Sequence, residues 1–339
     1  MNFIYPAKWT VNDVELLAAD SQLNEVQFFD KVPKTVLEAV EKTILTHRPE
    51  FSVRFYGFYG ESFDARCLRL IPSVTNLTVN CIDKADHAEV LGELAHLKQL
   101  CVGIYNLTEL SFLDALPPTL EQLSLEGAKA KNLSLRALPR FRGLKTLYLE
   151  GHTKEIESIA ALKDLENLTL RSVTLPSLEF LAGLSALGSF ALKLGGTRNL
   201  DALPRLANLK YLEIWQVQKL ADLSVLADVV SLQFLFLQSL PNVKRLPSLA
   251  KLKNLRRVYL ETMKGLKDLA QIAEAPALAE LLYVAANQLQ PQDFECFLRH
   301  PTLKKAAVGF GSVKRNDELA TMFQRAGIAD FSPTAFEYR

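Results

Sequence analysis

The sequence predicts an α/β right-handed solenoid: one long curved parallel β-sheet, 3₁₀ turns or short helices on its convex side, and helical caps at its ends. Two observations predict this fold. A leucine motif, L-x-x-L-x-L, returns at intervals of 21 to 25 residues along the 339-residue chain. Upstream of the motif, apolar residues fall at every third position. A single such unit cannot bury its leucines, so we expect successive units to stack and share one core.

The end of each motif predicts a short strand. Its two-residue spacing places alternate side chains on one face, so the leucines point inward and the residues between them point to solvent. Parallel stacking of these strands would then build the sheet. The motif begins at Val74, Leu97, Leu120, Leu144, Leu165, Leu187, Leu209, Leu232, Leu255, Leu278 and Leu303.

The segments between the strands predict thin return turns. In Leu246, Leu249 and Leu252 the apolar spacing is three residues, which fits a 3₁₀ turn or an extended coil better than an α-helix. Prolines such as Pro204 and Pro247 lie in these segments. Each would cost about 3 kcal/mol inside an α-helix, which argues against an all-helical solenoid.

The patterns at the two ends predict caps on the solenoid. We divide the chain into an N-terminal cap (1–50), the repeats (51–312) and a C-terminal helical cap (313–339). The first segment is a β-α cap continuous with the repeats, and its first helix opens at Thr10 with Asp13 and runs through Ala19. A strand around Val26 and an amphipathic helix within residues 32–47 follow, and Trp9 is expected to pack over the open end. At the other end we expect a helix over 291–300 and a last helix that begins near Asn316 or Asp317 and stops at Gly327.

The stretch LADLSVLADVVSLQFLFL, residues 220–237, resembles the leucine-rich repeat family, and the resemblance covers roughly residues 50–312. It is similar to the short class of about 22 residues found in bacterial internalins and in SDS22-type phosphatase regulators. In that family the ninth repeat position usually holds an asparagine that satisfies loop backbone groups. This asparagine ladder is absent here, so we expect irregular loops after the strands. The ninth positions hold Ile82, Tyr105, Ala128, His152, Val173, Gly195, Val217, Leu240 and Met263.

Charge and cysteine content limit the partners and the compartment. Lys plus Arg is 39 and Asp plus Glu is 38, so no net charge favours nucleic acid or anionic lipid. No window of eighteen apolar residues predicts a membrane span, and the first twenty residues do not read as a secretory signal. The four cysteines form no CxxC pair. We therefore expect a cytoplasmic protein in a reduced state, with neither nucleic acid nor a membrane as partner.

The sequence contains no pattern that predicts catalysis. None of the five histidines pairs with another His or Cys at metal-ligand spacing, and no glycine-rich loop has phosphate-binding spacing. We therefore expect no enzyme, no catalytic residue, no metal and no cofactor.

The solvent face of the predicted sheet changes character in three adjacent repeats, those beginning at 209, 232 and 255. Earlier repeats carry small or polar residues there, whereas these three bring aromatic side chains together, framed by charges. Exposed aromatic patches are typical of binding sites, and Trp, Tyr and Arg dominate binding energies. The predicted partner-binding residues are Tyr211, Glu213, Trp215, Phe234, Phe236, Arg257, Tyr259 and Glu261.

These observations favour a scaffold that binds another protein on this face of the sheet. In that interpretation the aromatic residues supply apolar burial and the charged residues set orientation. Two alternatives stay open: the aromatic residues stack only to stabilise the sheet, or they mediate self-assembly into a homo-oligomer. A small-molecule or glycan site is less favoured, because an open sheet encloses little volume.

Overall fold

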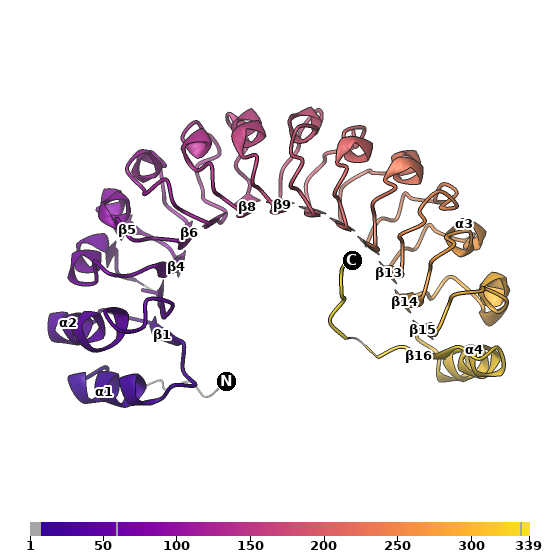
Figure 1. Cartoon of the computed structure of the whole chain (residues 1–339), viewed down its shortest axis with the longest axis horizontal. Coiled ribbons are helices and arrows are strands. Elements are labelled where there is room, and N and C mark those ends of the chain that lie inside the picture. Colours follow the sequence, from indigo (N-terminus) through magenta and orange to yellow (C-terminus); the bar gives the residue numbers. More distant parts are fainter. Residues whose placement is uncertain (1–7, 59, 333) are drawn as a thin grey trace. The chain divides into compact units, whose positions relative to one another are not determined.

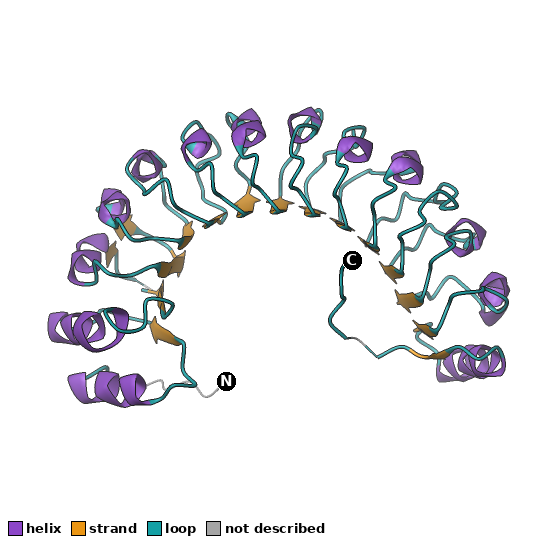
Figure 2. Cartoon of the chain, in the orientation of Figure 1, coloured by secondary structure: helices purple, strands orange, loops and turns teal. Residues whose placement is uncertain are grey.

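The structure, a computed structural model, describes residues 8–58, 60–332 and 334–339. The chain forms two compact units that divide between Leu165 and Glu166. In each unit, parallel strands line one side and short helical turns line the other (Figure 1), as the colouring in Figure 2 shows. The predicted α/β solenoid with a parallel sheet is therefore confirmed. Residues 1–7, part of the stretch that does not read as a secretory signal, lie outside the described residues.

The first unit begins with helices and continues with strands and 3₁₀ turns. Its parallel sheet has the order β1-β2-β4-β6-β7-β8, and β3 pairs with β5 in a separate ribbon. The elements are α1 (Val11–Ala19), β1 (Glu25–Phe28), α2 (Lys34–Val40), the π-helical turn η1 (Glu41–Leu45), β2 (Ser52–Gly57), β3 (Phe63–Asp64), η2 (Ala65–Leu70), β4 (Asn76–Ile82), β5 (Ala85–Asp86), η3 (Ala88–Glu93), β6 (Gln99–Ile104), η4 (Ser111–Asp114), β7 (Gln122–Leu125), η5 (Leu138–Arg140), β8 (Thr146–Glu150) and η6 (Ile156–Ala161).

The first helix begins at the N-cap that the sequence predicts. The main-chain N–H of Thr10 donates to the Asp13 carboxylate (2.8 Å), and the Thr10 hydroxyl accepts from the Asp13 N–H, so α1 starts with a capping box. The Trp9 ring packs edge-on against Phe28, with centroids 5.2 Å apart. Because β1 pairs in parallel with β2, this segment extends the sheet of the unit, and its role as a cap stays a prediction.

The second unit repeats the same coil with few interruptions. Its strands β9 to β15 pair in parallel without a shift in register, so residues at the same repeat position lie side by side. The elements are β9 (Asn167–Arg171), η7 (Glu179–Leu181), β10 (Ser189–Lys193), η8 (Leu203–Arg205), β11 (Tyr211–Trp215), η9 (Ser224–Asp228), β12 (Phe234–Gln238), β13 (Arg257–Glu261), α3 (Ala270–Ala273), β14 (Glu280–Val284), η10 (Pro291–Phe297), β15 (Lys305–Val308), α4 (Val313–Arg325) and β16 (Ala329–Asp330).

The motif leucines form the core, as their spacing predicts. Leu232, Leu235 and Leu237 are each 0% exposed, and so are Leu249 and Leu252 from a return segment. Burying one such side chain contributes roughly 1.5–3 kcal/mol. Every coil adds leucines at the same repeat positions. The core therefore lengthens from coil to coil but keeps the same width.

The C-terminal helices differ from the prediction in detail. The segment after Pro291 forms a 3₁₀ helix, and α4 begins at Val313 rather than near Asn316 or Asp317. Ser312 is the N-cap, because its hydroxyl accepts from the main-chain N–H of Arg315. The side chain of Asn316 instead accepts a hydrogen bond from the Phe310 N–H (2.9 Å). Gly327, at φ +77°, follows the helix end as predicted.

The turns after the strands are regular in the second unit, so the prediction of irregular loops is wrong there. In the first unit the register shifts after Tyr56 and after Val79, so the ends of β2 and β4 are irregular, as predicted. Residue eight of each repeat adopts a left-handed backbone, with φ between 51° and 61° from Ser172 to Ala285. From Ser172 to Thr262 the N–H of this residue donates to a carbonyl of the next coil, as from Gln216 to Gln238 (2.9 Å) and from Thr262 to Val284 (2.9 Å). The main chain thus makes an inter-coil ladder of its own. Residue nine is free to be apolar and buried, as in Val173, Val217, Leu240 and Met263.

His152 is the one polar side chain among the buried residues at position nine of the described repeats. It is 2% exposed, its Nε2 lies 3.0 Å from the Glu126 main-chain oxygen, and its Nδ1 has no hydrogen-bond partner among the described residues. Burial lowers the pKa of His152 below its usual value of 6.5. The folded chain therefore holds the neutral imidazole at pH values where the unfolded chain binds a proton.

We expect this histidine to make the chain less stable in mild acid. Because the unfolded state takes up a proton first, the free energy of unfolding should fall as the pH drops below about 6.5, by at most about 1.4 kcal/mol per pH unit. Urea unfolding between pH 7.5 and 5.5 measures this slope. His152→Gln should flatten it, whereas replacing the exposed His96 with Gln should leave it unchanged. Equal slopes in all three chains would contradict the assignment.

Candidate functional site

The eight predicted residues lie on three adjacent strands of the second unit. The register aligns Tyr211 with Phe234 and Arg257, then Glu213 with Phe236 and Tyr259, and finally Trp215 with Gln238 and Glu261. Each position is two residues from the next, so all of these side chains share the face opposite the leucine core. Their juxtaposition on one face, predicted from repeat spacing, is confirmed. Their part in binding a partner stays a prediction.

The aromatic side chains form two separate pairs rather than one continuous layer. Phe236 and Tyr259 stack in parallel, with centroids 4.3 Å apart and 10° between the planes. Tyr211 and Phe234 meet edge to face at 5.0 Å and 70°. All four are half-buried. Such pairs contribute about 0.5–1.5 kcal/mol beyond their buried area, so part of their role is to stabilise the sheet.

Trp215 lies beside the basic residues of the preceding strands. The Arg171 guanidinium carbon is 5.3 Å from the Trp215 ring centroid, and the Lys193 Nζ is 5.8 Å from it. Lys193 also pairs with Glu213 at 2.9 Å, and Glu213 accepts a hydrogen bond from the Tyr211 hydroxyl at 3.1 Å. Burial and the neighbouring Glu213 carboxylate raise the pKa of Tyr211. These contacts hold Trp215 and Tyr211 in fixed orientations on a half-buried surface.

Two of the predicted charges are buried. Arg257 is 6% exposed and donates from Nε to the Glu280 carboxylate at 2.6 Å, and Glu213 is 7% exposed. Sequence reasoning treated both as rim charges, because a solvent-facing position predicts exposure. Lys193 on the preceding strand pairs with Glu213, whereas Glu280 on the next strand and the Phe331 and Phe336 rings lie against Arg257. The strand period does not encode these contacts. Glu261, by contrast, is half-buried and accepts from the Tyr259 hydroxyl at 3.2 Å.

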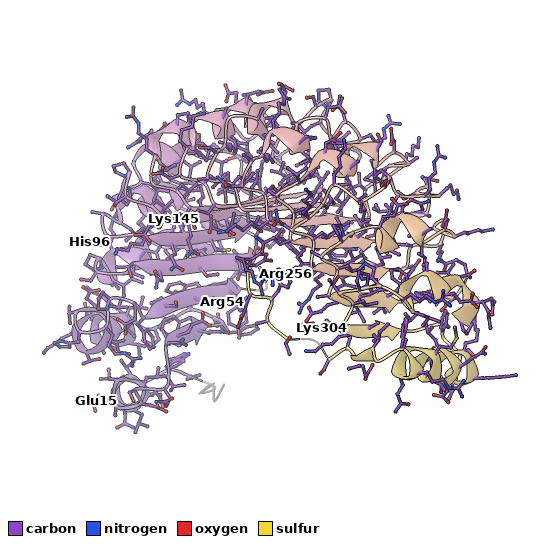
Figure 3. The ribbon with its side chains drawn as sticks, turned by 45° about the vertical axis from the view of Figure 1, so that its right-hand side comes forward. Glu15, Arg54, His96, Lys145, Arg256 and Lys304 are labelled. Atoms are coloured by element: carbon purple, nitrogen blue, oxygen red, sulfur yellow. The ribbon has the colours of Figure 1, made fainter. Side chains whose placement is uncertain are left out.

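Residues 334–339, here called the C-terminal tail, were missed by the sequence reasoning. After β16 the chain turns back over the sheet face (Figure 1), and Arg256, labelled in Figure 3, lies beside the tail. The Phe336 ring packs on Phe234, with centroids 5.4 Å apart. The guanidinium carbons of Arg256 and Arg257 are 4.6 Å and 4.9 Å from the centroid of the Phe336 ring. The sequence feature that could have indicated this contact is the pair of aromatic residues Phe336 and Tyr338, two positions apart beyond the last helix.

The tail is also bound through its main chain. Arg257 Nη1 donates to the Thr334 carbonyl at 3.0 Å, and Arg256 donates to the Glu337 carbonyl. Gln233 both donates to the Arg339 main-chain oxygen (2.6 Å) and accepts from its N–H (2.9 Å). The tail thus covers the end of the surface at which β12 and β13 begin. None of its hydrogen bonds among the described residues reaches Trp215, Phe236 or Tyr259.

A hollow of about 600 Å³ adjoins the tail. Tyr338 forms one wall, and Tyr211 and Lys210 lie at the start of β11. The other lining residues are small or polar, including Gly188, Ser189 and Asn208. The hollow therefore lies between Tyr338 and residues at the start of β9, β10 and β11.

The described part of the chain contains neither a metal-binding cluster nor a helix that could span a membrane. No group of three or more His, Cys, Asp or Glu residues there is arranged to hold a metal ion. None of the helices in residues 8–58, 60–332 and 334–339 combines the length and apolar character that crossing a bilayer requires.

The repeat, the in-register parallel strands and the 3₁₀ turns define a leucine-rich repeat solenoid. Among solved structures, the chain is similar to an internalin (inlF) from Listeria monocytogenes, with a TM-score of 0.61 and 19% sequence identity over 96% of this chain and 90% of that one. It also matches internalin C2 (inlC2) from the same organism, with a TM-score of 0.41 and 21% identity over 65% of this chain and 84% of that one. The first likeness confirms the fold.

No protein-family model matches the sequence, and no curated protein matches it either. Assignment to the SDS22-type class therefore stays a prediction.

Proposed function

We propose that the chain is a scaffold that binds another protein on the solvent face of β11, β12 and β13. One observation carries the proposal: aromatic side chains from three adjacent strands gather on one half-exposed face, next to the tail and the hollow. Aromatic residues at half-buried positions can bury further area against a partner at little entropic cost, and they are enriched at interfaces.

Within this surface the residues have different roles. Trp215, Phe236 and Tyr259 are the anchors, because no hydrogen bond of the described tail reaches them and each keeps part of its ring exposed. Glu261, at the end of β13, would set orientation through charge. Glu213 and Arg257 support the surface from below through their ion pairs with Lys193 and Glu280.

A double variant, Trp215→Ala with Phe236→Ala, tests the proposal. We expect its affinity for the partner to fall at least about 30-fold, since loss of a hot-spot side chain costs about 2 kcal/mol or more. The partner is first captured from native cell lysate with the wild-type chain and identified by mass spectrometry, and its Kd is then measured by calorimetry. Tyr105→Ala, which removes an aromatic residue that is 52% exposed in the first unit, is the matched control.

Equal affinity of the double variant and the Tyr105→Ala control would reject the site. Light scattering on the same proteins tests self-assembly. A concentration-dependent dimer that disappears in the double variant would assign the surface to a homo-oligomer instead.

We also infer that the chain acts by binding rather than by catalysis, in a reducing compartment such as the cytoplasm. The four cysteines, all within the described residues, form no disulfide, which supports a reduced environment. Labelling of free thiols on the chain in intact cells would check the compartment.

A further inference from the structure

The start of β12 and β13 holds a segment of the chain's own backbone, and this arrangement carries an inference about the ligand. We propose that Gln233, Phe234, Arg256 and Arg257 form a recognition groove for an extended peptide with two aromatic residues two positions apart, and that the C-terminal tail occupies this groove in cis. The inference deepens the proposed function and rests on it for the statement that a partner uses this face.

The polar contacts show what the groove recognises. The hydrogen bonds between the groove and the tail are made to main-chain atoms, namely the carbonyls of Thr334 and Glu337 and both the N–H and oxygen of Arg339. The side-chain amide of Gln233 both donates and accepts a hydrogen bond with one residue of the tail. A neighbouring β-strand bonds a peptide backbone in the same paired way. Such a site selects an extended backbone and tolerates many side chains.

The ring contacts supply the specificity. The Phe336 ring packs against the Phe234 ring and against the guanidinium groups of Arg256 and Arg257. It also meets the Tyr338 ring edge to face, with centroids 4.9 Å apart. An aromatic ring here gains both stacking and cation–π attraction, which an aliphatic side chain would lack. Residues two apart on an extended segment point to the same side, so Phe336 and Tyr338 can both reach the sheet. The aromatic-x-aromatic spacing therefore belongs to the preferred ligand.

The groove is fixed, whereas the tail is only lightly held. Bonds within the sheet layer hold the groove residues without the tail, including the hydrogen bond from Arg256 to Gln233 (3.0 Å) and the ion pair of Arg257 with Glu280. In the tail, by contrast, only Phe336 is half-buried and the other five residues are exposed. A partner peptide can therefore replace the tail without rearranging the groove.

Tethering sets the strength of the competition. A few residues join β16 to the tail, so its effective concentration at the groove is in the millimolar range. A free peptide that binds the empty groove with a Kd of about 100 μM would bind the occupied groove about tenfold more weakly. Competition with the tail therefore favours partners whose affinity for the groove is higher than that of the tail, or partners that bind the chain at more than one site.

A labelled peptide with the sequence of residues 334–339, TAFEYR, is the probe. Its Kd is measured by fluorescence polarisation against the full chain, against the full chain with Phe336→Ala, and against a chain that ends after Phe331. Phe331 is retained because its ring lies 5.2 Å from the Arg257 guanidinium and is 7% exposed. We expect both altered chains to bind the peptide at least about tenfold more tightly than the unaltered chain. Circular dichroism confirms that they remain folded.

Two further variants locate the binding. Adding Gln233→Ala to the shortened chain should weaken binding at least about tenfold, and so should replacing the phenylalanine of the probe with alanine. The inference is overturned if neither altered chain binds more tightly than the full chain, or if Gln233→Ala has no effect. It is also overturned if sedimentation shows a dimer of the full chain that truncation abolishes, because the tail would then bind in trans.

The two proposals fail separately. If the peptide binds as expected but Trp215→Ala with Phe236→Ala retains the partner, the groove stands and the proposed function fails. If that double variant loses the partner but the peptide does not bind the shortened chain, only the present inference fails.

Discussion

Gly195→Ala is expected to destabilise the chain by about 2–5 kcal/mol, which makes it one of the most damaging single-methyl additions. Gly195 has φ +71°, a conformation that costs other residues about 1–2 kcal/mol. A Cβ there would lie 2.0 Å from the carbonyl oxygen of Val173 in the neighbouring coil, and relieving such an overlap costs about 1–3 kcal/mol more. Urea unfolding followed by circular dichroism measures the loss.

The matched control is Gly188→Ala in the same unit. A Cβ on Gly188 would meet backbone oxygens at 3.8 Å and 3.9 Å, which are ordinary contacts. We expect no loss of stability there, and a gain of up to about 1 kcal/mol from reduced freedom of the unfolded chain. If the two alanines have similar effects, then the close approach of the coils at Gly195 does not limit stability.

Arg257→Ala is expected to cost about 2–3 kcal/mol of stability, because it leaves the Glu280 carboxylate unpaired in a partly buried site. Breaking a fully buried pair typically costs about 3–5 kcal/mol, and the value is lower here because 19% of the Glu280 side chain is still exposed. Adding Glu280→Ala should recover part of the loss. Thermal and urea unfolding of the two single variants and the double variant give the coupling energy.

Two comparisons test whether the loss of stability comes from the buried ion pair between Arg257 and Glu280. Arg205→Ala removes a pair with Glu179 whose side chains are 48% and 64% exposed, so its effect should be within about 1 kcal/mol. Arg257→Ala in the chain that ends after Phe331 should lose nearly as much stability as in the full chain, since Glu280, not the tail, is the critical partner. If shortening the chain removes most of the effect, this assignment is contradicted.

The strand register was predictable because burial along a strand follows its period. Leu235 and Leu237 point inward for the same reason that Phe234 and Phe236 point outward, so counting residues was sufficient to place the candidate surface on β11 to β13. The left-handed turn residues were not predictable. Leu194 and Thr262 occupy them, although such residues seldom adopt positive φ, and in each case the N–H donates a hydrogen bond to the next coil that helps to offset the cost.

The exposure of the candidate site depended on neighbours that are distant in the sequence. Arg257 is buried by Glu280 and by rings of the chain's last residues, and no local pattern around position 257 encodes either contact. The start of α4 was also misplaced, because Ser312 and Asn316 are both acceptable caps and the Phe310 N–H engages the second.

By itself, the amino-acid sequence determined the repeat length, the strands, the buried leucines and the face on which the aromatic residues gather, because each follows from local periodicity. Only the tertiary structure decided which of those surface residues remain accessible and that the C-terminal tail lies over Phe234. Accessibility depends on which side chains of other coils, and of the returning chain, lie against a residue, and no local period specifies those contacts.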